Sequence, residues 1–180
     1  MNWKKLLSEY ISQHIYFTAR KDRCERPDGS IVDPYFVVEL PTSVCAVALT
    51  DNNEVVMVKQ YRHPLGEVLL ELPGGFTDPG EDAQQSIARE LLEETGYQFK
   101  AYQYLGKIAA NPGVLNNYTL LYLATGGVKV ASQQLDANEE IEMVLVPLED
   151  LKAMLRRNEI AQALHATCIF YALDALDNKG

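Results

Sequence analysis

Residues 75 to 97 read GFTDPGEDAQQSIARELLEETGY and crowd acidic residues onto one predicted helix. At about 100° per residue, Glu90, Glu93 and Glu94 fall within an arc of roughly 100°, while the apolar residues of the segment point to the other side. Like charges four residues apart destabilise a helix by roughly 0.2 to 0.5 kcal/mol per pair. The clustering therefore indicates a bound cation that offsets the repulsion, and a hard divalent ion is the natural candidate.

Local signals mark both ends of this helix. The turn sequence DPG at 78–80 precedes it, and Asp82 with Gln85 favours a capped first turn. Gly96 is typical of the residue that ends a helix. We therefore expect a helix over 82–95.

The spacing of the motif is more specific than the acidic cluster alone. An isolated REXXEE string is more often a solvated, Glu-rich helix face. Here the longer pattern G-x5-E-x7-R-E-U-x-E-E-x-G-U, with U apolar, is complete. At roughly 7% per residue type, seven fixed identities arise by chance with a probability on the order of 10⁻⁸ per starting position. The pattern is filled by Gly75, Glu81, Arg89, Glu90, Leu91, Glu93, Glu94, Gly96 and Tyr97.

This segment resembles the Nudix box, with Tyr97 as a mild variant at a site that is more often aliphatic. The sequence KQYR at 59–62, followed by ELPGG at 71–75, is similar to the approach to the box in ADP-ribose pyrophosphatases. Pro112, fifteen residues after the box, is similar to a mark of that subfamily. The resemblance implies an α/β fold, an α/β/α sandwich with a mixed β-sheet and an N-terminal β-hairpin extension.

The resemblance also implies a metal site. By position, Glu90, Glu93 and Glu94 would hold Mg²⁺ or Mn²⁺ directly or through water, together with the main-chain carbonyl of Gly74. The other motif residues would support the site without binding substrate: Gly75, Glu81, Gly96 and an orienting Arg89. The plainer interpretation of Arg89 is a surface ion pair with Glu93 four residues later.

The general base and the phosphate contact come from outside the box. In the ADP-ribose pyrophosphatases a glutamate on a later loop takes the proton from the attacking water, and the run NEEIE at 138–142 occupies that region. We expect Glu140 to be this base, with Glu139 as second choice and Glu93 as the fallback if the loop is an ordinary solvated one. Arg62 matches an arginine that contacts substrate phosphate, although a lone arginine after a strand is often a surface charge.

The activity implied is metal-dependent hydrolysis of the pyrophosphate bond of a nucleoside diphosphate derivative. ADP-ribose, cleaved to AMP and ribose 5-phosphate, is the first choice. After Pro112 the chain reads GVLNN at 113–117, where many ADP-ribose enzymes carry an acidic residue, so another sugar such as GDP-mannose stays open. A Nudix-fold sensor that binds a nucleotide sugar without cleaving it is a further alternative, which the intact set of glutamates disfavours.

Composition limits the class of protein and its partners. The 180 residues are 47% hydrophobic, enough for a sizeable core, and the net charge of -9 argues against binding a nucleic-acid backbone. No apolar run approaches the length of a membrane span and the first residues lack a signal pattern, so we expect a cytoplasmic protein. The three cysteines suggest neither disulfide nor zinc site, and Cys45 and Cys168 are expected in the core.

The pattern along the chain predicts two regions, an N-terminal extension at 1–42 and a Nudix hydrolase domain at 43–180. The first would hold a helix at 3–12 and a hairpin of strands at 15–25 and 35–40, and the resemblance implies that it builds a homodimer. The second would hold strands at 43–50, 54–61, 68–72, 99–108, 118–124 and 142–146, and helices at 148–156 and 159–176 in addition to the box helix.

Overall fold

A computed structural model describes residues 1–14, 17–137 and 139–178. The chain divides into two compact units. The N-terminal unit consists of Met1–Pro41 together with Ala109–Tyr118, and the main unit consists of Thr42–Ile108 and Thr119–Gly180. The segment 109–118, which the sequence placed in the second region, therefore belongs with the N-terminal strands.

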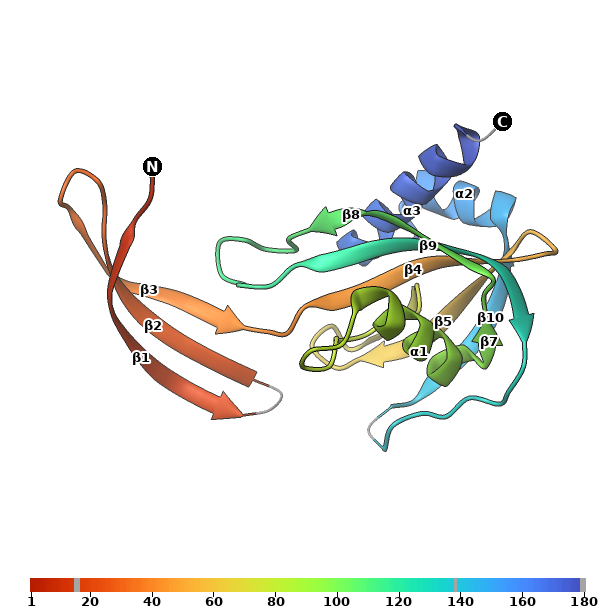
Figure 1. Ribbon diagram of the computed structural model, residues 1–180, viewed down its shortest axis with the longest axis horizontal. Coiled ribbons are helices and arrows are strands. Elements are labelled where there is room, and N and C mark those ends of the chain that lie inside the picture. The colour runs from red at the N-terminus through yellow and green to blue at the C-terminus, as the bar shows by residue number, and fades with distance from the viewer. Residues whose placement is uncertain (15–16, 138, 179–180) are drawn as a thin grey trace. The chain divides into compact units, whose positions relative to one another are not determined.

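The N-terminal unit is an antiparallel sheet in the order β1-β2-β3 (Figure 1). Its strands are β1 (Lys4–His14), β2 (Phe17–Glu25) and β3 (Ile31–Glu39). The predicted helix at 3–12 is wrong, because this segment pairs along its length with β2. Irregularities between Lys5 and Leu7 and between Tyr10 and Ser12 break the strand alternation. The apolar residues of this strand therefore do not alternate with polar ones. They recur at helix-like spacing, which is why the sequence predicted a helix here.

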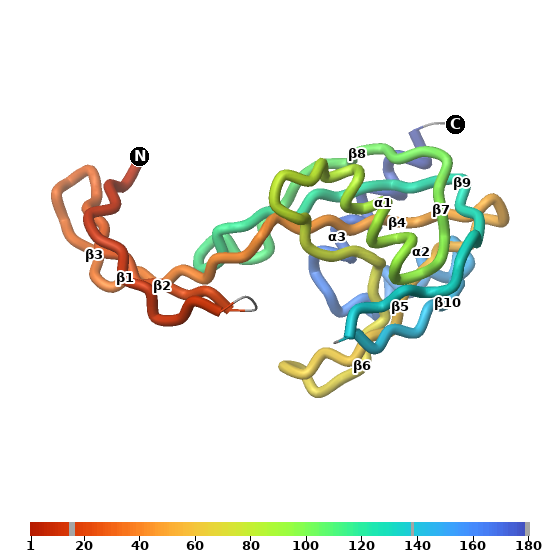
Figure 2. Tube along the Cα trace, turned by 60° about the horizontal axis from the view of Figure 1, so that its bottom comes forward, coloured from red at the N-terminus to blue at the C-terminus, as the bar shows by residue number. Residues whose placement is uncertain are grey.

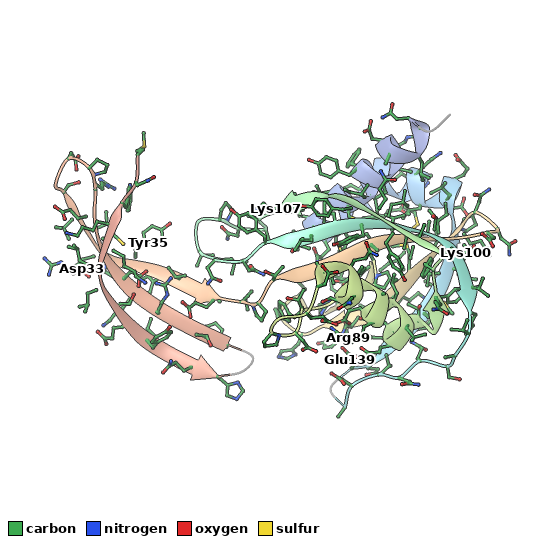
Figure 3. All side chains as sticks on the ribbon, in the orientation of Figure 1. Asp33, Tyr35, Arg89, Lys100, Lys107 and Glu139 are labelled. Carbon is green, nitrogen blue, oxygen red and sulfur yellow. The ribbon has the colours of Figure 1, made fainter. Side chains whose placement is uncertain are left out.

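The segment 109–118, which lies between β8 and β9 in the sequence, is hydrogen-bonded to β3. Val38 donates its main-chain N–H to the carbonyl of Val114, and the Tyr35 hydroxyl donates to the carbonyl of Gly113. The side-chain oxygen of Asn116 accepts the N–H of Leu40. The segment that follows Pro112 is thus held within the N-terminal unit, where Figure 3 labels Tyr35 on β3.

The main unit is built on a seven-stranded mixed sheet. The order is β10-β5-β4-β9-β7, with β6 paired to β5 and β8 paired to β9. All pairs are antiparallel except β4 with β9. The strands are β4 (Ser43–Thr50), β5 (Glu54–Arg62), β6 (Glu67–Glu71), β7 (Tyr97–Gln98), β8 (Ala101–Ile108), β9 (Thr119–Lys129) and β10 (Ile141–Pro147).

Helices cover both faces of this sheet, which confirms the predicted α/β/α sandwich (Figure 1). The helices are α1 (Ala83–Thr95), α2 (Leu148–Arg156) and α3 (Ala163–Asp177). The last helix begins four residues later than predicted, because Gln162 caps it by accepting the N–H of Leu164. In the described part of the chain no helix is long and apolar enough to cross a membrane.

Strand β4 shows how the sequence builds two cores from one sheet. Its side chains alternate between the faces, as the two-residue period of a strand requires. Cys45, Val47 and Leu49 pack with the α2 and α3 side, where Cys168 is also buried as expected. The alternate residues Val44, Ala46 and Ala48 pack on the α1 side, with Ile87 and Leu91. The box helix is therefore held on a rigid central strand.

Candidate functional site

The loop that leads into α1 is pinned to the central strand by two glycines. Gly74 has a φ of +150°, and a Cβ there would overlap the carbonyl oxygen of Val44. A Cβ on Gly75 would lie 2.6 Å from Oε1 of Glu90. The N–H of Val44 donates to the carbonyl of Gly75 at 2.8 Å. Glycine at both positions lets the loop pass tightly between β4 and the helix and brings a carboxylate against its backbone.

Helix α1 begins and ends where the sequence predicts. The Asp82 side chain accepts the N–H groups of Gln84 and Gln85, and Gly96 ends the helix in the left-handed conformation with φ +74°. Ile87 and Leu91 are fully buried on the sheet side. This orientation turns the glutamates of the motif toward the loop at 72–76.

Two of these glutamates are buried enough to resist ionisation. Oε2 of Glu94 accepts the N–H of Gly74 at 2.9 Å. Burial raises the pKa of Glu94 to about 8, and the charges of Glu90 and Glu139 add to the effect. Burial likewise raises the pKa of Glu90 to about 7 against the opposing influence of Arg89. A cation placed between these carboxylates would lower the free energy needed to ionise them in their buried positions.

Arg89 connects the start of the helix to the acidic cluster. Its guanidinium donates to Glu81 at 3.1 Å and to Glu90 and Glu93 at 3.0 Å each. A further hydrogen bond reaches the carbonyl of Phe76 at 3.3 Å. The structure thus contains the simple ion pair with Glu93, but within a network that also orients Glu90.

Glu81 anchors that network at the head of the helix. It accepts the N–H of Asp78 at 3.1 Å and the hydroxyl of Ser86 at 2.5 Å. The hydrogen bond from Arg89 is the main cause that lowers the pKa of Glu81 to about 2. Glu81 is thus an ionised partner of Arg89 at neutral pH.

Arg62 is held by a buried carboxylate that sequence reasoning gave no role. Its Nε donates to Oε1 of Glu71 at 3.0 Å, and its Nη2 makes a short hydrogen bond to Oε2. Glu71 is 1% exposed, whereas the Arg62 side chain is 41% exposed. The charges of Glu94 and Glu139 also raise the pKa of Arg62. A charged residue inside the apolar run VLLEL at 68–72 was the signal that could have identified Glu71.

The buried His165 is hydrogen-bonded to Leu72, the residue that follows the end of β6. Nδ1 of His165, on α3, accepts the N–H of Leu72 at 3.2 Å. Burial lowers the pKa of His165 to about 4, so the ring is neutral at pH 7. Leu72 lies directly before the loop with the two glycines, and His165 therefore fixes the point where this loop begins.

The acidic run after β9 brings Glu139 to the site. Its charge raises the pKa of both Glu90 and Glu94, and Figure 3 shows Glu139 on the same side of α1 as Arg89. Oε2 of Glu139 accepts the N–H of Asp136 at 3.1 Å. Glu140 is exposed and is not among the main influences on these pKa values. The charge interactions therefore favour Glu139, the second choice made from the sequence, and the identity of the base stays a prediction; Asn138 lies outside the described residues.

The donor set fits a hard divalent ion that keeps part of its water shell. Within residues 1–14, 17–137 and 139–178, no three Asp, Glu, His or Cys side chains already converge on one point as ligands. Mg²⁺ does not need such a cage, because it usually binds through one or two carboxylates and several waters. Glu90 and Glu94 supply oxygen ligands, and Gly75 leaves no side chain in front of Glu90.

Comparison with known families matches nearly the whole chain. Residues 39–166 match the family described as NUDIX domain. Residues 3–38 match the family described as Nucleoside diphosphate sugar hydrolase N-terminal domain. The boundary between the two matches falls at the end of β3.

Curated proteins and one solved structure show the same likeness. The chain is 30% identical to the methanol dehydrogenase activator of Bacillus methanolicus, over 93% of this chain and 91% of that protein. It is 34% identical to an ADP-ribose pyrophosphatase of Mycobacterium tuberculosis, over 91% and 79% respectively. A crystal structure of an ADP compounds hydrolase superposes with a TM-score of 0.87 at 21% identity, over 100% of this chain and 97% of that one, which shows a shared fold.

Proposed function

This chain belongs to the Nudix family of hydrolases, and we propose that it splits the pyrophosphate bond of a nucleoside diphosphate sugar. ADP-ribose, yielding AMP and ribose 5-phosphate, is the substrate that we place first. The observation that carries the proposal is the pair formed by the buried Glu94 and the partly buried Glu90, set against the glycine loop and under the influence of the Glu139 charge. The match of residues 3–38 to a nucleoside diphosphate sugar hydrolase domain supports the substrate class.

Nudix hydrolases depend on divalent metal ions, and we propose Mg²⁺ or Mn²⁺ here. Glu90, Glu93 and Glu94 would hold the ion directly or through water, together with the carbonyl of Gly74. When bound, a divalent ion neutralises charge on the pyrophosphate and lowers the pKa of a water molecule. Arg89 keeps Glu90 and Glu93 in place through hydrogen bonds of 3.0 Å, so the ligand side chains are oriented before an ion arrives.

Side chains of this protein must take up the proton of the attacking water and bind the charged phosphates of the substrate. In the reaction, the oxygen of water bonds to one phosphorus, the bond from that phosphorus to the bridging oxygen breaks, and two phosphate monoesters leave. We assign the proton of the attacking water to Glu139, in preference to Glu140 and with Glu93 as the fallback. Arg62, locked by Glu71 on one edge of its guanidinium, would bind a phosphate oxygen with its remaining N–H groups.

Two alternative functions are hydrolysis of a different nucleotide sugar and binding of a nucleotide sugar without cleavage. The segment 109–118 lacks the acidic residue typical of many ADP-ribose enzymes, which keeps another sugar such as GDP-mannose open. A sensor that binds without cleavage would not require the complete set of ligand glutamates.

A second candidate function comes from the relative named methanol dehydrogenase activator, which matches over most of both chains. Under this alternative the chain would raise the rate of a methanol dehydrogenase. The rate of such an enzyme with and without the purified chain tests it, and an unchanged rate would reject it.

We also propose that the chain forms a homodimer through its N-terminal unit. Leu7 is 62% exposed, Ile11 57% and Phe36 55%, which is a large apolar area for strands left in water. A second copy of this sheet would cover it. Sedimentation at micromolar concentration should give a dimer mass, and a monomer would reject the proposal. A cytoplasmic location remains a prediction of the sequence.

A substrate panel tests the main proposal. The purified protein with Mg²⁺ or Mn²⁺ should hydrolyse ADP-ribose faster than GDP-mannose and other nucleoside diphosphate compounds, and mass spectrometry should identify AMP and ribose 5-phosphate. A different preferred compound would change the substrate, and binding without turnover would support the sensor instead.

A further inference from the structure

The loop between β9 and β10 is docked on the carboxyl end of α1 through its residues 130–134. The carbonyl of Gly96 accepts the N–H groups of Val130 and Ala131, at 2.9 and 3.1 Å. A Cβ on Gly96 would overlap the carbonyl oxygen of Ala131. The last glycine of the motif therefore does more than end the helix, because its bare Cα makes room for this loop. Figure 2 shows the chain after β9 passing the end of α1 on its way to β10.

The side chain of Gln133 connects the β9–β10 loop to both α1 and β10. Nε2 of Gln133 donates to the carbonyl of Glu94 at 2.6 Å and to the carbonyl of Ile141 at 3.1 Å. The neighbouring N–H of Gln134 donates to the carbonyl of Glu93 at 2.8 Å. Carbonyls in the last turn of a helix have no partner within the helix. Here the β9–β10 loop supplies hydrogen-bond donors to two of these carbonyls, those of Glu93 and Glu94.

The same amide holds the loop at both ends. Gln133 lies where the β9–β10 loop meets α1, and Ile141 is the first residue of β10, which pairs with Gln60 of β5. Between these two points lies Glu139. The Glu139 carboxylate is held within a local turn, since it accepts the N–H of Asp136. Six residues of extended chain can span roughly 20 Å, so the anchor at Gln133 limits where this turn lies relative to α1. Misplacing a reacting group by about 1 Å can cost on the order of 10² in rate.

We propose that Gln133 is a positioning residue for hydrolysis: it clamps the β9–β10 loop to the end of α1 and so sets Glu139 relative to Glu90 and Glu94. This inference rests on the proposed function, in which Glu139 takes the proton of the attacking water. Gln133 itself touches main-chain carbonyls and has no part in the chemistry.

Hydrogen exchange tests the clamp without using activity. Gln133→Met keeps the length of the side chain and removes the donor, and Gln133→Glu keeps its shape but sets a carboxylate against two carbonyls. The control is Gln134→Glu, which adds the same charge one residue away on an exposed side chain and keeps the main-chain bond to Glu93. Amides of residues 131–137 and 139–141 should exchange at least about tenfold faster in both Gln133 variants and at the wild-type rate in the control.

Kinetics test the consequence for catalysis. Loss of the donor should lower kcat by about 10- to 100-fold, the range seen for residues that orient a ligand or base, with KM within a factor of about three. The decisive measurement is the double variant with Glu139→Gln. If Gln133 acts through Glu139, adding Gln133→Met to Glu139→Gln should lower kcat no further, whereas independent effects multiply.

The outcomes separate the two proposals. An active wild type whose Gln133→Met variant keeps both loop protection and kcat would overturn the role of Gln133 alone. Multiplicative losses in the double variant would also overturn it, since they would mean a general structural effect. A wild type that hydrolyses no compound of the panel, or a fully active Glu139→Gln, would overturn the proposed chemistry, while the exchange data would still decide whether Gln133 holds the loop.

Discussion

Acidification should destabilise this protein through His165. The imidazole is 6% exposed, and its Nδ1 accepts the N–H of Leu72 at 3.2 Å. Burial lowers its pKa from 6.5 to about 4; the charge of Glu71 opposes this shift and that of Arg62 adds to it. The unfolded chain therefore takes up a proton near pH 6.5, whereas the folded chain does so only near pH 4. Stability is complete above this window and is lost as the pH falls through it. At 1.36 kcal/mol per pKa unit, the loss between pH 7 and pH 4 is about 3 kcal/mol.

Urea unfolding from pH 7 to pH 4 with a metal chelator measures this loss. The comparison is with His165→Gln, whose amide oxygen can still accept the N–H of Leu72 but takes up no proton. Wild type should lose about 3 kcal/mol more than the variant over this range. Glu90 and Glu94, whose raised pKa values favour the folded state on acidification, titrate in both proteins and cancel in the difference. Equal pH dependences of the two proteins would show that the folded state does not hold His165 in its neutral form.

Three substitutions test the site. Glu94→Gln should lower kcat by at least about 10² with an unchanged urea midpoint; normal turnover in the folded variant would remove Glu94 from the site. Glu139→Gln should lower kcat by about 10² to 10⁴, whereas Glu140→Gln should leave it within a factor of about two, and the reverse order would restore Glu140 as the base. Gly75→Ala, whose Cβ would lie 2.6 Å from Oε1 of Glu90, should raise the Mg²⁺ concentration for half-maximal activity about tenfold; an unchanged concentration would show that Glu90 does not hold the ion.

Features encoded by neighbours in sequence were predictable. The ends of α1 follow from Asp82 and Gly96, because capping is a local interaction. The strands β4 and β5 follow from apolar runs separated by turn residues. The mixed sheet covered by helices follows from predicted strands that interleave with the box helix and the terminal helices, and the resemblance of the motif to a family implies the same fold.

Features that depend on distant partners were not predictable from the sequence. Strand β1 has helix-like spacing, and only its pairing with β2 decides its conformation. The choice between Glu139 and Glu140 depends on which of two adjacent carboxylates turns toward α1. The partnership of Arg62 with Glu71 and the two hydrogen bonds of Gln133 join residues that only the folded chain brings together.

Binding of Mn²⁺ followed by electron paramagnetic resonance shows whether Glu90 and Glu94 hold a metal ion, because it detects the ion without assuming a substrate. The comparison is among wild type, the double variant Glu90→Gln with Glu94→Gln, and Glu142→Gln as a control on an exposed carboxylate. Wild type and the control should bind the ion equally, and the double variant should bind it at least about tenfold more weakly. Equal Mn²⁺ binding by all three proteins would show that Glu90 and Glu94 do not hold the ion.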